Sequence, residues 1–355
     1  MKIFIKTYGC QANINDSELL AGRLLREGNE IVDNESEADK IIVNTCSVKN
    51  KTQSKILHYI SEIENKPGKR KREIEVGGCL VKTRDLNSKF PDIKIIDTIN
   101  TNKLDSNIPI LRHNNELAII QISQGCLNSC TFCATKLARG NLKSYRIGDI
   151  KRQVEKAVSE GCKIIYLTSQ DNGCYGRDIK TNLPELLNQL TSIEGNFKIR
   201  VGMMNPWHLR KILPQLINAY KSERIQKFIH IPVQSGSEKV LKDMKRIHTV
   251  EEFRQVAEEF RKAFPREKFP DSTIATDVIV GFPSETENYF QDTLKLIAEI
   301  KPEVLNISAF SSRPKTPASK LKQLSSETVK QRTKLLNELY LSYRKKIIHP
   351  IKILA

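Results

Sequence analysis

Three closely spaced cysteines carry the clearest chemical signal in this chain. Cys126, Cys130 and Cys133 follow a Cys-x3-Cys-x2-Cys pattern. Thiolates at this spacing can bind three irons of a 4Fe-4S cluster, whereas a cluster that only transfers electrons usually has four thiolate ligands. The pattern therefore predicts a cluster with one iron open to an outside ligand. S-adenosylmethionine is the usual ligand at such an iron.

Two other uses of clustered cysteines have to be weighed. A structural zinc site needs four ligands, normally from two separated pairs, and His113 stands at the wrong distance in sequence for a compact zinc knuckle. Disulfides form in oxidising compartments, and the start of the chain, Met1 to Lys6, lacks the long apolar core and the cleavage site of a secretory leader. These observations favour an iron-sulfur site in the reducing cytoplasm, with zinc as the alternative.

Length and charge limit the class of protein. The chain has 355 residues, of which 39% are hydrophobic, so two domains with buried cores are expected. No apolar run approaches the roughly 20 residues that cross a bilayer, so we expect no membrane partner. Lys and Arg number 58 against 41 Asp and Glu, giving a net charge of +17. This excess favours a polyanionic partner, although it also fits a generally lysine-rich composition.

The first hundred residues predict a small open α/β domain with a parallel sheet. Strands are expected at 2–7, 41–43 and 74–76, and helices at 16–26 and 52–63. Each strand is followed within a few residues by a cysteine, namely Cys10, Cys46 and Cys79. Because ligands of such sheets lie beyond the carboxyl ends of the strands, we expect these three thiols to be neighbours. This favours a second three-thiolate cluster over three unrelated buried thiols.

The rest of the chain predicts a partial (β/α)6 barrel. A polar linker is expected at 101–116, the barrel at 117–325, and a final helix with a short tail at 326–355. Cys126 to Cys133 would follow the first barrel strand, at the mouth where such barrels place their chemistry. The expected strands are 118–123, 163–168, 198–201, 227–231, 272–280 and 304–308, and the expected helices are 150–160, 183–190, 238–244, 250–263 and 289–300.

Taken together, these features resemble the radical S-adenosylmethionine methylthiotransferases over almost the whole chain. The resemblance rests on the six cysteines in register and on short segments around them. Those segments are Thr7-Tyr8-Gly9-Cys10-Gln11, Asn44-Thr45-Cys46, Gly77-Gly78-Cys79, Pro232-Val233-Gln234-Ser235-Gly236-Ser237 and Asp277-Val278-Ile279-Val280-Gly281-Phe282-Pro283.

The resemblance implies cofactors and site residues. Two 4Fe-4S clusters are expected, one on Cys126, Cys130 and Cys133 that also binds S-adenosylmethionine, and one on Cys10, Cys46 and Cys79 whose free iron carries the sulfur to be inserted. The first would generate a radical that removes hydrogen from an unactivated C-H bond. Further cofactor-binding residues are expected after the barrel strands and in the cysteine loop: Phe132, Ser169, Gln170, Asp171 and Gln234.

Branches of this family modify threonylcarbamoyladenosine or isopentenyladenosine in tRNA, or an aspartate of a ribosomal protein. The segments Cys133 to Gly140 and Leu167 to Asp178 resemble the archaeal and eukaryotic threonylcarbamoyladenosine branch. Its reaction would methylthiolate the adenosine at position 37 of tRNA, beside the anticodon, where an unstacked loop base is accessible. Lys136 and Arg139 are the expected substrate-binding residues, because their charges would suit a substrate carboxylate.

The resemblance also implies partner molecules, and the chain departs from the family pattern at its C-terminal end. An electron donor of the flavodoxin or ferredoxin type and a sulfur donor are expected besides tRNA. The family's usual C-terminal β-barrel that binds tRNA has no room after Ile347, so either the chain is cut short or this member binds RNA with its other domains. A protein that merely binds RNA through an iron-sulfur or zinc site, without catalysis, is the alternative of a different class.

Overall fold

The computed structural model describes residues 1–65, 72–99 and 109–347. Residues 101–108, half of the predicted linker, and the tail after residue 347 lie outside the described residues. The described chain forms two compact units. The first consists of Met1–Cys126, Ala134–Gln170 and Gly195–Phe197, and the second of Leu127–Cys133, Asp171–Glu194 and the chain from Lys198 on.

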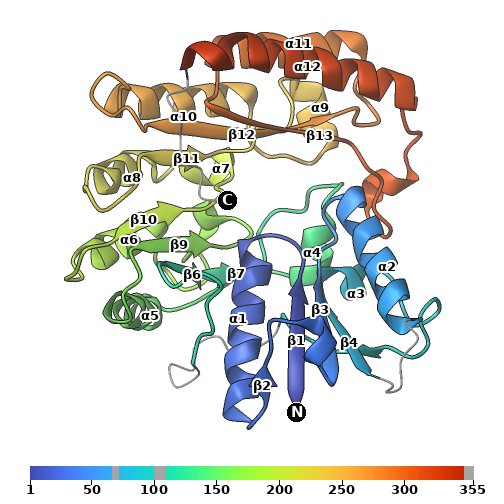
Figure 1. Ribbon diagram of the computed structural model, residues 1–355. Coiled ribbons are helices and arrows are strands. Elements are labelled where there is room, and N and C mark those ends of the chain that lie inside the picture. Colours follow the sequence, from blue (N-terminus) through green and yellow to red (C-terminus); the bar gives the residue numbers. More distant parts are fainter. Residues whose placement is uncertain (66–71, 100–108, 348–355) are drawn as a thin grey trace. The chain divides into compact units, whose positions relative to one another are not determined.

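A five-stranded parallel sheet forms the centre of the first unit (Figure 1). The predicted strands are confirmed as β1 (Lys2–Thr7), β3 (Lys40–Thr45) and β4 (Glu73–Gly78). Two-residue strands extend it, β2 (Glu30–Ile31) beside β1 and β5 (Lys94–Ile95) beside β4. All four pairings are parallel, so the carboxyl ends of β1, β3 and β4 meet at one edge.

Helices cover both faces of this sheet because side chains alternate along β3. Ile41 and Val43 belong to the apolar cluster that includes α2 (Asn50–Glu64). Ile42 packs on the other face with Leu20 of α1 (Gln11–Arg26). Burying each such side chain is worth about 1.5–3 kcal/mol, so this alternation fixes which strand residues face which helix.

Helix α1 begins earlier than predicted. The first turns, which carry buried Asn13, Asn15 and Asp16, lack apolar periodicity, so the sequence predicted a start at Asp16. The helix actually starts at Gln11, with Cys10 as its N-cap residue. These buried polar side chains make hydrogen bonds inside the unit, and those bonds offset the cost of removing polar groups from water.

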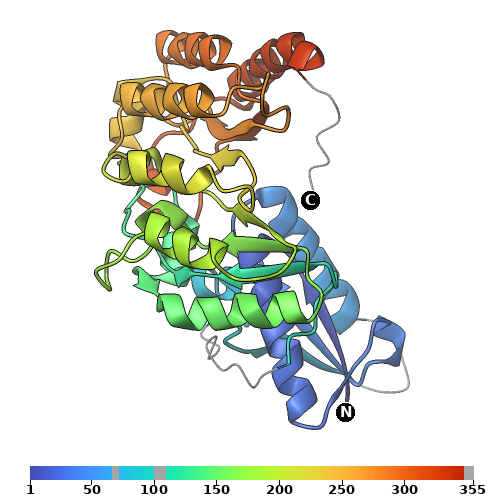
Figure 2. The same ribbon diagram turned by 90° about the vertical axis from the view of Figure 1, so that its left-hand side faces the viewer.

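The first unit also contains the first two barrel strands. Strand β6 (Leu117–Gln121) pairs in parallel with β9 (Ile164–Thr168), and α5 (Ile147–Ser159) packs on β6 (Figure 2). The short strands β7 (Ser123–Gln124) and β8 (Lys143–Ser144) form an antiparallel pair. The Asn15 side chain donates a buried hydrogen bond of 2.8 Å to the carbonyl of Ile119, which ties α1 to β6.

A three-stranded parallel sheet, β11-β12-β13, forms the core of the second unit. The long C-terminal helix packs against β13 and lies beside α11 (Figure 1). Of the described residues, no helix is long and apolar enough to span a membrane. The elements of this unit are β10 (Lys198–Val201), β11 (Phe228–His230), β12 (Thr273–Val280), β13 (Val304–Ala309), α6 (Leu183–Thr191), α7 (Pro206–Leu209), α8 (Leu213–Tyr220), α9 (Glu238–Asp243), α10 (Val250–Ala263), α11 (Glu287–Ile300) and α12 (Ser326–Ile347).

Candidate iron-sulfur sites

Three of the predicted cysteines gather around one asparagine in the first unit. The Asn13 side-chain oxygen lies 4.0 Å from the Cys10 sulfur and 3.8 Å from the Cys79 sulfur. The Asn13 amide nitrogen donates to the carbonyl of Thr45, the residue before Cys46, at 2.8 Å. The thiols that follow β1, β3 and β4 are therefore neighbours, as the sequence predicted.

The backbone leaves no room for side chains beside two of these cysteines. Gly9 and Gly78 both have positive φ, at +128° and +89°. A Cβ on Gly9 would lie 3.0 Å from the Cβ of Cys46, and one on Gly78 would lie 2.4 Å from the Thr45 carbonyl oxygen. Glycine therefore lets the strand ends approach closely enough for the thiols to converge.

A buried ion pair lies beside these thiols. An Arg139 Nη2 donates to Asp16 at 2.6 Å and to the Asn13 oxygen at 2.7 Å, and the two charged side chains are 1% and 0% exposed. Arg139 ends the short helix α4 (Ala134–Arg139), whose Ala138 packs with Cys79. The sequence predicted that this guanidinium binds a substrate carboxylate, whereas in the structure it forms an ion pair with Asp16 inside the unit.

The electrostatic environment of Cys79 follows from this packing. Burial raises the pKa of the Cys79 thiol to about 11, and the positive charge of Arg139 acts in the opposite direction. Cys46 is also buried, while Cys10 is exposed. All eight cysteines of the chain lie in the described part, and none of them forms a disulfide.

The second predicted cysteine set begins on a loop that side chains and backbone fix in place. Within the first unit, the Cys126 N-H donates to the carbonyl of Gly140 at 3.3 Å. Lys136 donates to the Cys126 carbonyl and, at 2.8 Å, to Asn141. Gln170 accepts a hydrogen bond of 2.6 Å from the N-H of Gly125. Lys136 and Gln170, predicted as substrate and cofactor contacts, therefore hold the backbone around Cys126.

The later part of the loop is held within the second unit. The Thr131 N-H donates to the Met244 carbonyl at 3.0 Å, and Phe132 packs against the apolar cluster that contains Met244. Phe132 therefore anchors the loop between Cys130 and Cys133. The guanidinium of Arg246 lies 3.8 Å from the Cys130 sulfur and also donates to the Pro232 carbonyl at 2.7 Å.

Asp171 is buried, and its carboxylate makes several hydrogen bonds, one of them to the same loop. One carboxylate oxygen accepts the N-H groups of Gly173 and Asn205, each at 3.0 Å. The other accepts the side chain of Asn128, within the cysteine loop, at 3.2 Å and lies 3.4 Å from His208. We therefore assign Asp171, predicted as a cofactor contact, to positioning the loop.

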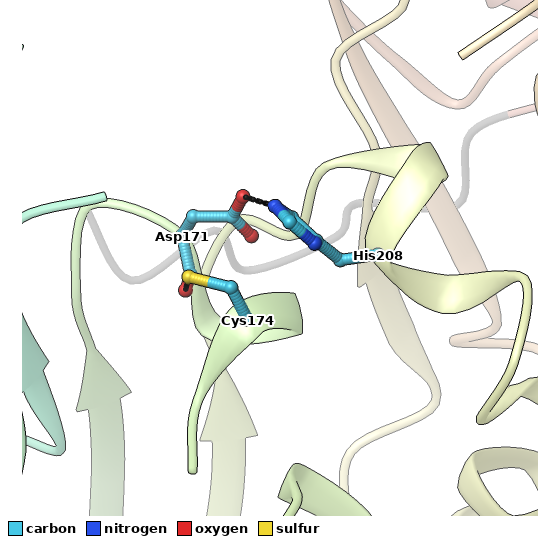
Figure 3. Close-up of side chains that lie close together, drawn as sticks. All are labelled: Asp171, Cys174 and His208. Atoms are coloured by element: carbon cyan, nitrogen blue, oxygen red, sulfur yellow. Dashed lines mark hydrogen bonds and ion pairs between the residues drawn. The ribbon is translucent and has the colours of Figure 1, made fainter. Parts of the chain in front are cut away.

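His208 and Cys174 complete this group, and Figure 3 shows both beside Asp171. The three side chains offer ligand atoms within 4.8 Å of one another. Burial lowers the pKa of His208 to about 3, with Arg177 and Arg246 acting in the same direction, so the imidazole is neutral near pH 7. The Cys174 thiol donates to the Asp171 carbonyl at 3.1 Å. The Asp171 carboxylate and the Cys174 thiol already have protein partners, whereas both ring nitrogens of His208 are buried without a hydrogen-bond partner among the described residues.

Gln234 is the predicted cofactor residue whose surroundings fit a ligand best. It follows β11 with a φ of +71°, a left-handed conformation that non-glycine residues rarely adopt. Its side-chain oxygen is buried without a hydrogen-bond partner in the described chain. A strained backbone and an unsatisfied acceptor are both typical of ligand sites. For Ser169, which directly follows β9, the cofactor contact stays a prediction.

Comparison with known proteins decides the family. The model of the Radical SAM superfamily matches residues 120–297, and that of the Uncharacterized protein family UPF0004 matches residues 2–97. A Pyrococcus horikoshii protein named "Probable threonylcarbamoyladenosine tRNA methylthiotransferase" is 43% identical over all of this chain and 88% of its own length. The human threonylcarbamoyladenosine tRNA methylthiotransferase is 38% identical over 96% of this chain and 63% of its own length. The chain belongs to the threonylcarbamoyladenosine tRNA methylthiotransferase family.

Solved structures support the same fold. The radical S-adenosylmethionine methyltransferase TsrM from Kitasatospora setae has a TM-score of 0.64, covering 90% of this chain and 77% of that one. The cobalamin-dependent S-adenosylmethionine radical enzyme OxsB has a TM-score of 0.57, covering 98% and 56%. The identities are 13% and 14%, so the likeness shows the radical S-adenosylmethionine fold that the sequence predicted, and no more.

The residues of this methylthiotransferase family member fit the cofactors that the family implies. The N-terminal set offers three thiols and a buried Arg139 Nη1 without a hydrogen-bond partner in the described chain. Such an unsatisfied cationic donor fits an anionic acceptor among the thiols. In the second unit, Gln234 offers a buried side-chain oxygen that has no hydrogen-bond partner among the described residues.

Sequence reasoning missed Asn13, Asn128 and Arg246 at these sites. Asn13 and Asn128 are a few residues from a cysteine, but isolated asparagines are common in turns and carry no signal of their own. Arg246 is far from Cys130 in sequence and is brought near it only by the fold.

Proposed function

We propose that this chain methylthiolates N6-threonylcarbamoyladenosine at position 37 of tRNA, using S-adenosylmethionine and two 4Fe-4S clusters. The observation that carries the proposal is the convergence of Cys10, Cys46 and Cys79 on Asn13, in addition to the Cys-x3-Cys-x2-Cys loop. A radical enzyme without sulfur insertion needs only the loop. The matches to threonylcarbamoyladenosine methylthiotransferases over the full chain select the substrate.

Cys126, Cys130 and Cys133 would hold the cluster that binds S-adenosylmethionine, and Cys10, Cys46 and Cys79 would hold the other. With S-adenosylmethionine, such a cluster supplies radical chemistry at an unactivated C-H bond, which no side chain can provide. The chain's own residues fix the ligands. Lys136 holds the carbonyl of Cys126, and Asp171 holds Asn128. Gln234 would offer its unsatisfied side-chain oxygen to S-adenosylmethionine, and Ser169 stays a candidate contact.

The proposed partners follow from the same chemistry. A flavodoxin- or ferredoxin-like protein supplies electrons, a separate sulfur donor supplies sulfide, and tRNA offers its anticodon loop. The net charge of +17 supports a polyanionic substrate. Eight cysteines without a disulfide support a reducing cytoplasmic setting.

Anaerobic reconstitution followed by iron and sulfide analysis tests the cofactors. We expect about eight of each per chain, falling to about four when alanine replaces Cys126, Cys130 and Cys133, and likewise when it replaces Cys10, Cys46 and Cys79. Zinc without iron would contradict the proposal. About four irons in the unchanged protein would remove the second cluster and with it the basis for sulfur insertion.

Incubation with candidate substrates tests the specificity. We expect a mass gain of S plus CH2 on adenosine from tRNA that carries the threonylcarbamoyl group. tRNA with isopentenyladenosine and the ribosomal protein substrate serve as matched comparisons. Modification of either of these, without modification of threonylcarbamoyladenosine, would assign the chain to another branch of the chemistry.

A further inference from the structure

Arg139 has one buried N-H group whose acceptor is missing. Its Nη2 is satisfied by Asp16 and Asn13, but Nη1 is buried and has no hydrogen-bond partner among the described residues. Leaving a buried donor unsatisfied costs about 1–3 kcal/mol, and more when the group is charged. At a side chain that is 1% exposed, such a donor is a candidate to bind an acceptor that the described chain does not itself supply.

The surroundings of the guanidinium indicate what that acceptor is. Asn13 Oδ1, which accepts from Arg139, also lies about 4 Å from the sulfurs of Cys10 and Cys79. Arg139 is close enough for its charge to act on both thiols. The acceptors that a cluster would add here are thiolate and sulfide sulfurs, which carry negative charge.

The charge balance supports the same conclusion. Asp16 and Arg139 neutralise each other, so before any cluster binds the pair adds no net charge. A 4Fe-4S core with three thiolates is anionic, and it becomes more so when it is reduced. A guanidinium donor beside it would therefore stabilise the reduced state more than the oxidised state, because hydrogen bonds and positive charge near the sulfurs raise cluster potentials.

We propose that Arg139 is a hydrogen-bond donor to the sulfur atoms of the cluster held by Cys10, Cys46 and Cys79, and that it raises the reduction potential of that cluster. This inference rests on the proposed function, because it takes those cysteines as cluster ligands. Asp16 is the positioning residue, since its carboxylate holds Nη2 and so orients the guanidinium. The helix α4 that carries Arg139 begins directly after Cys133, so one segment serves both cysteine sets.

The test is made in a parent protein in which alanine replaces Cys126, Cys130 and Cys133, so that only the N-terminal cluster remains. Arg139→Met alone would leave Asp16 as an unpaired buried charge and threatens folding. The informative variant is therefore the double change Asp16→Asn with Arg139→Met, which removes both charges. Arg139→Lys is the matched control, because it keeps the positive charge beside Asp16 without the planar fork.

Each reconstituted protein is titrated with a graded reductant and followed by electron paramagnetic resonance, and iron loss to a chelator is timed. We expect the double variant to have a more negative midpoint potential and faster iron loss than the parent, with Arg139→Lys between them.

Unchanged potential and unchanged iron loss in a double variant with about four irons would overturn the role of Arg139 and leave the cluster assignment standing. A parent that binds no iron would instead overturn the cluster assignment itself, and the role of Arg139 with it. The two failures are distinguished by the iron content of the parent.

Discussion

Two glycines near Cys126 form a matched pair that tests how tightly the cysteine loop is held. Gly125 and Gly140 have almost the same positive φ, +76° and +75°. A Cβ on Gly125 would lie 1.9 Å from the backbone oxygen of Asn141, whereas a Cβ on Gly140 would meet nothing within 4 Å. Alanine at either position is strained by its φ, but only at Gly125 does it also collide with backbone.

The difference can be put into numbers. The left-handed conformation costs an alanine about 1–2 kcal/mol at each position. Relieving the clash at Gly125 requires the backbone to move by roughly 1.5 Å, since ordinary contacts begin at 3.4 Å. Overpacking of this kind adds about 1–3 kcal/mol. We expect Gly140→Ala to lower the free energy of unfolding by about 1–2 kcal/mol and Gly125→Ala by about 2–5 kcal/mol.

The shift would also disturb the cluster ligand. Cys126 bonds to the Gly140 carbonyl, so moving the loop displaces the cysteine itself. Metal ligands must be held within about 0.5 Å of their productive geometry. We therefore expect the iron content to fall from about eight atoms per chain to about four in Gly125→Ala, and to stay at about eight in Gly140→Ala. Urea unfolding of the cluster-free proteins and iron analysis after reconstitution measure the two effects. Equal losses in both variants, or eight irons in Gly125→Ala, would refute the reasoning.

Three further predictions concern other buried groups. Burial lowers the pKa of both His208 and His248 to about 3, so the unfolded chain binds protons near pH 6.5 that the folded chain does not bind. Each histidine should therefore lower the free energy of unfolding by about 2 kcal/mol between pH 6.5 and pH 5. Replacing both histidines with glutamine should flatten the pH dependence of the urea midpoint. Arg332 donates to buried Glu285 at 3.0 Å, so Arg332→Met should lower the free energy of unfolding in urea by about 3–5 kcal/mol. Adding Glu285→Gln should restore part of that free energy, and a double variant as unstable as Arg332→Met would argue against the ion pair as the cause. Cys162 is buried and its thiol donates to the Asn115 carbonyl at 3.4 Å, so Cys162→Ala should leave the iron content at about eight, and a loss of iron would contradict its packing role.

Local patterns in the sequence predicted the elements well where one face is apolar. Strand 2–7, strand 198–201 and helix 250–263 have the bounds found in the structure. The last of these has clear periodicity and begins with a capping box between Thr249 and Glu252. Strands of two residues, such as β2 and β5, were missed because two residues cannot show an alternating pattern.

The thiol positions could be predicted, but the role of the charges around them could not. Parallel strands bring their carboxyl ends together whatever the side chains, so Cys10, Cys46 and Cys79 could be placed from topology alone. Arg139 was predicted to bind a substrate carboxylate, because nothing in the local sequence marks it as buried in an ion pair with Asp16. Its partner Asp16 lies 123 positions away, on a helix whose polar start concealed its burial.

The two cysteine sets are positioned by different kinds of structure, and they should respond differently to mutation. Cys46 and Cys79 directly follow β3 and β4, and Cys10 lies three residues after β1, so the backbone hydrogen bonds of the sheet set the spacing of these cysteines. The loop from Cys126 to Cys133 has almost no regular structure. It is held by a few separate hydrogen bonds, from side chains such as Lys136 and Asn128 and from the backbone of Cys126 and Thr131. Losing one bond therefore removes a smaller fraction of what fixes a strand end than of what fixes this loop. The ligand geometry of Cys126, Cys130 and Cys133 therefore depends on residues outside the cysteine motif. Asp171, which binds the side chain of Asn128 in the loop, is one such residue.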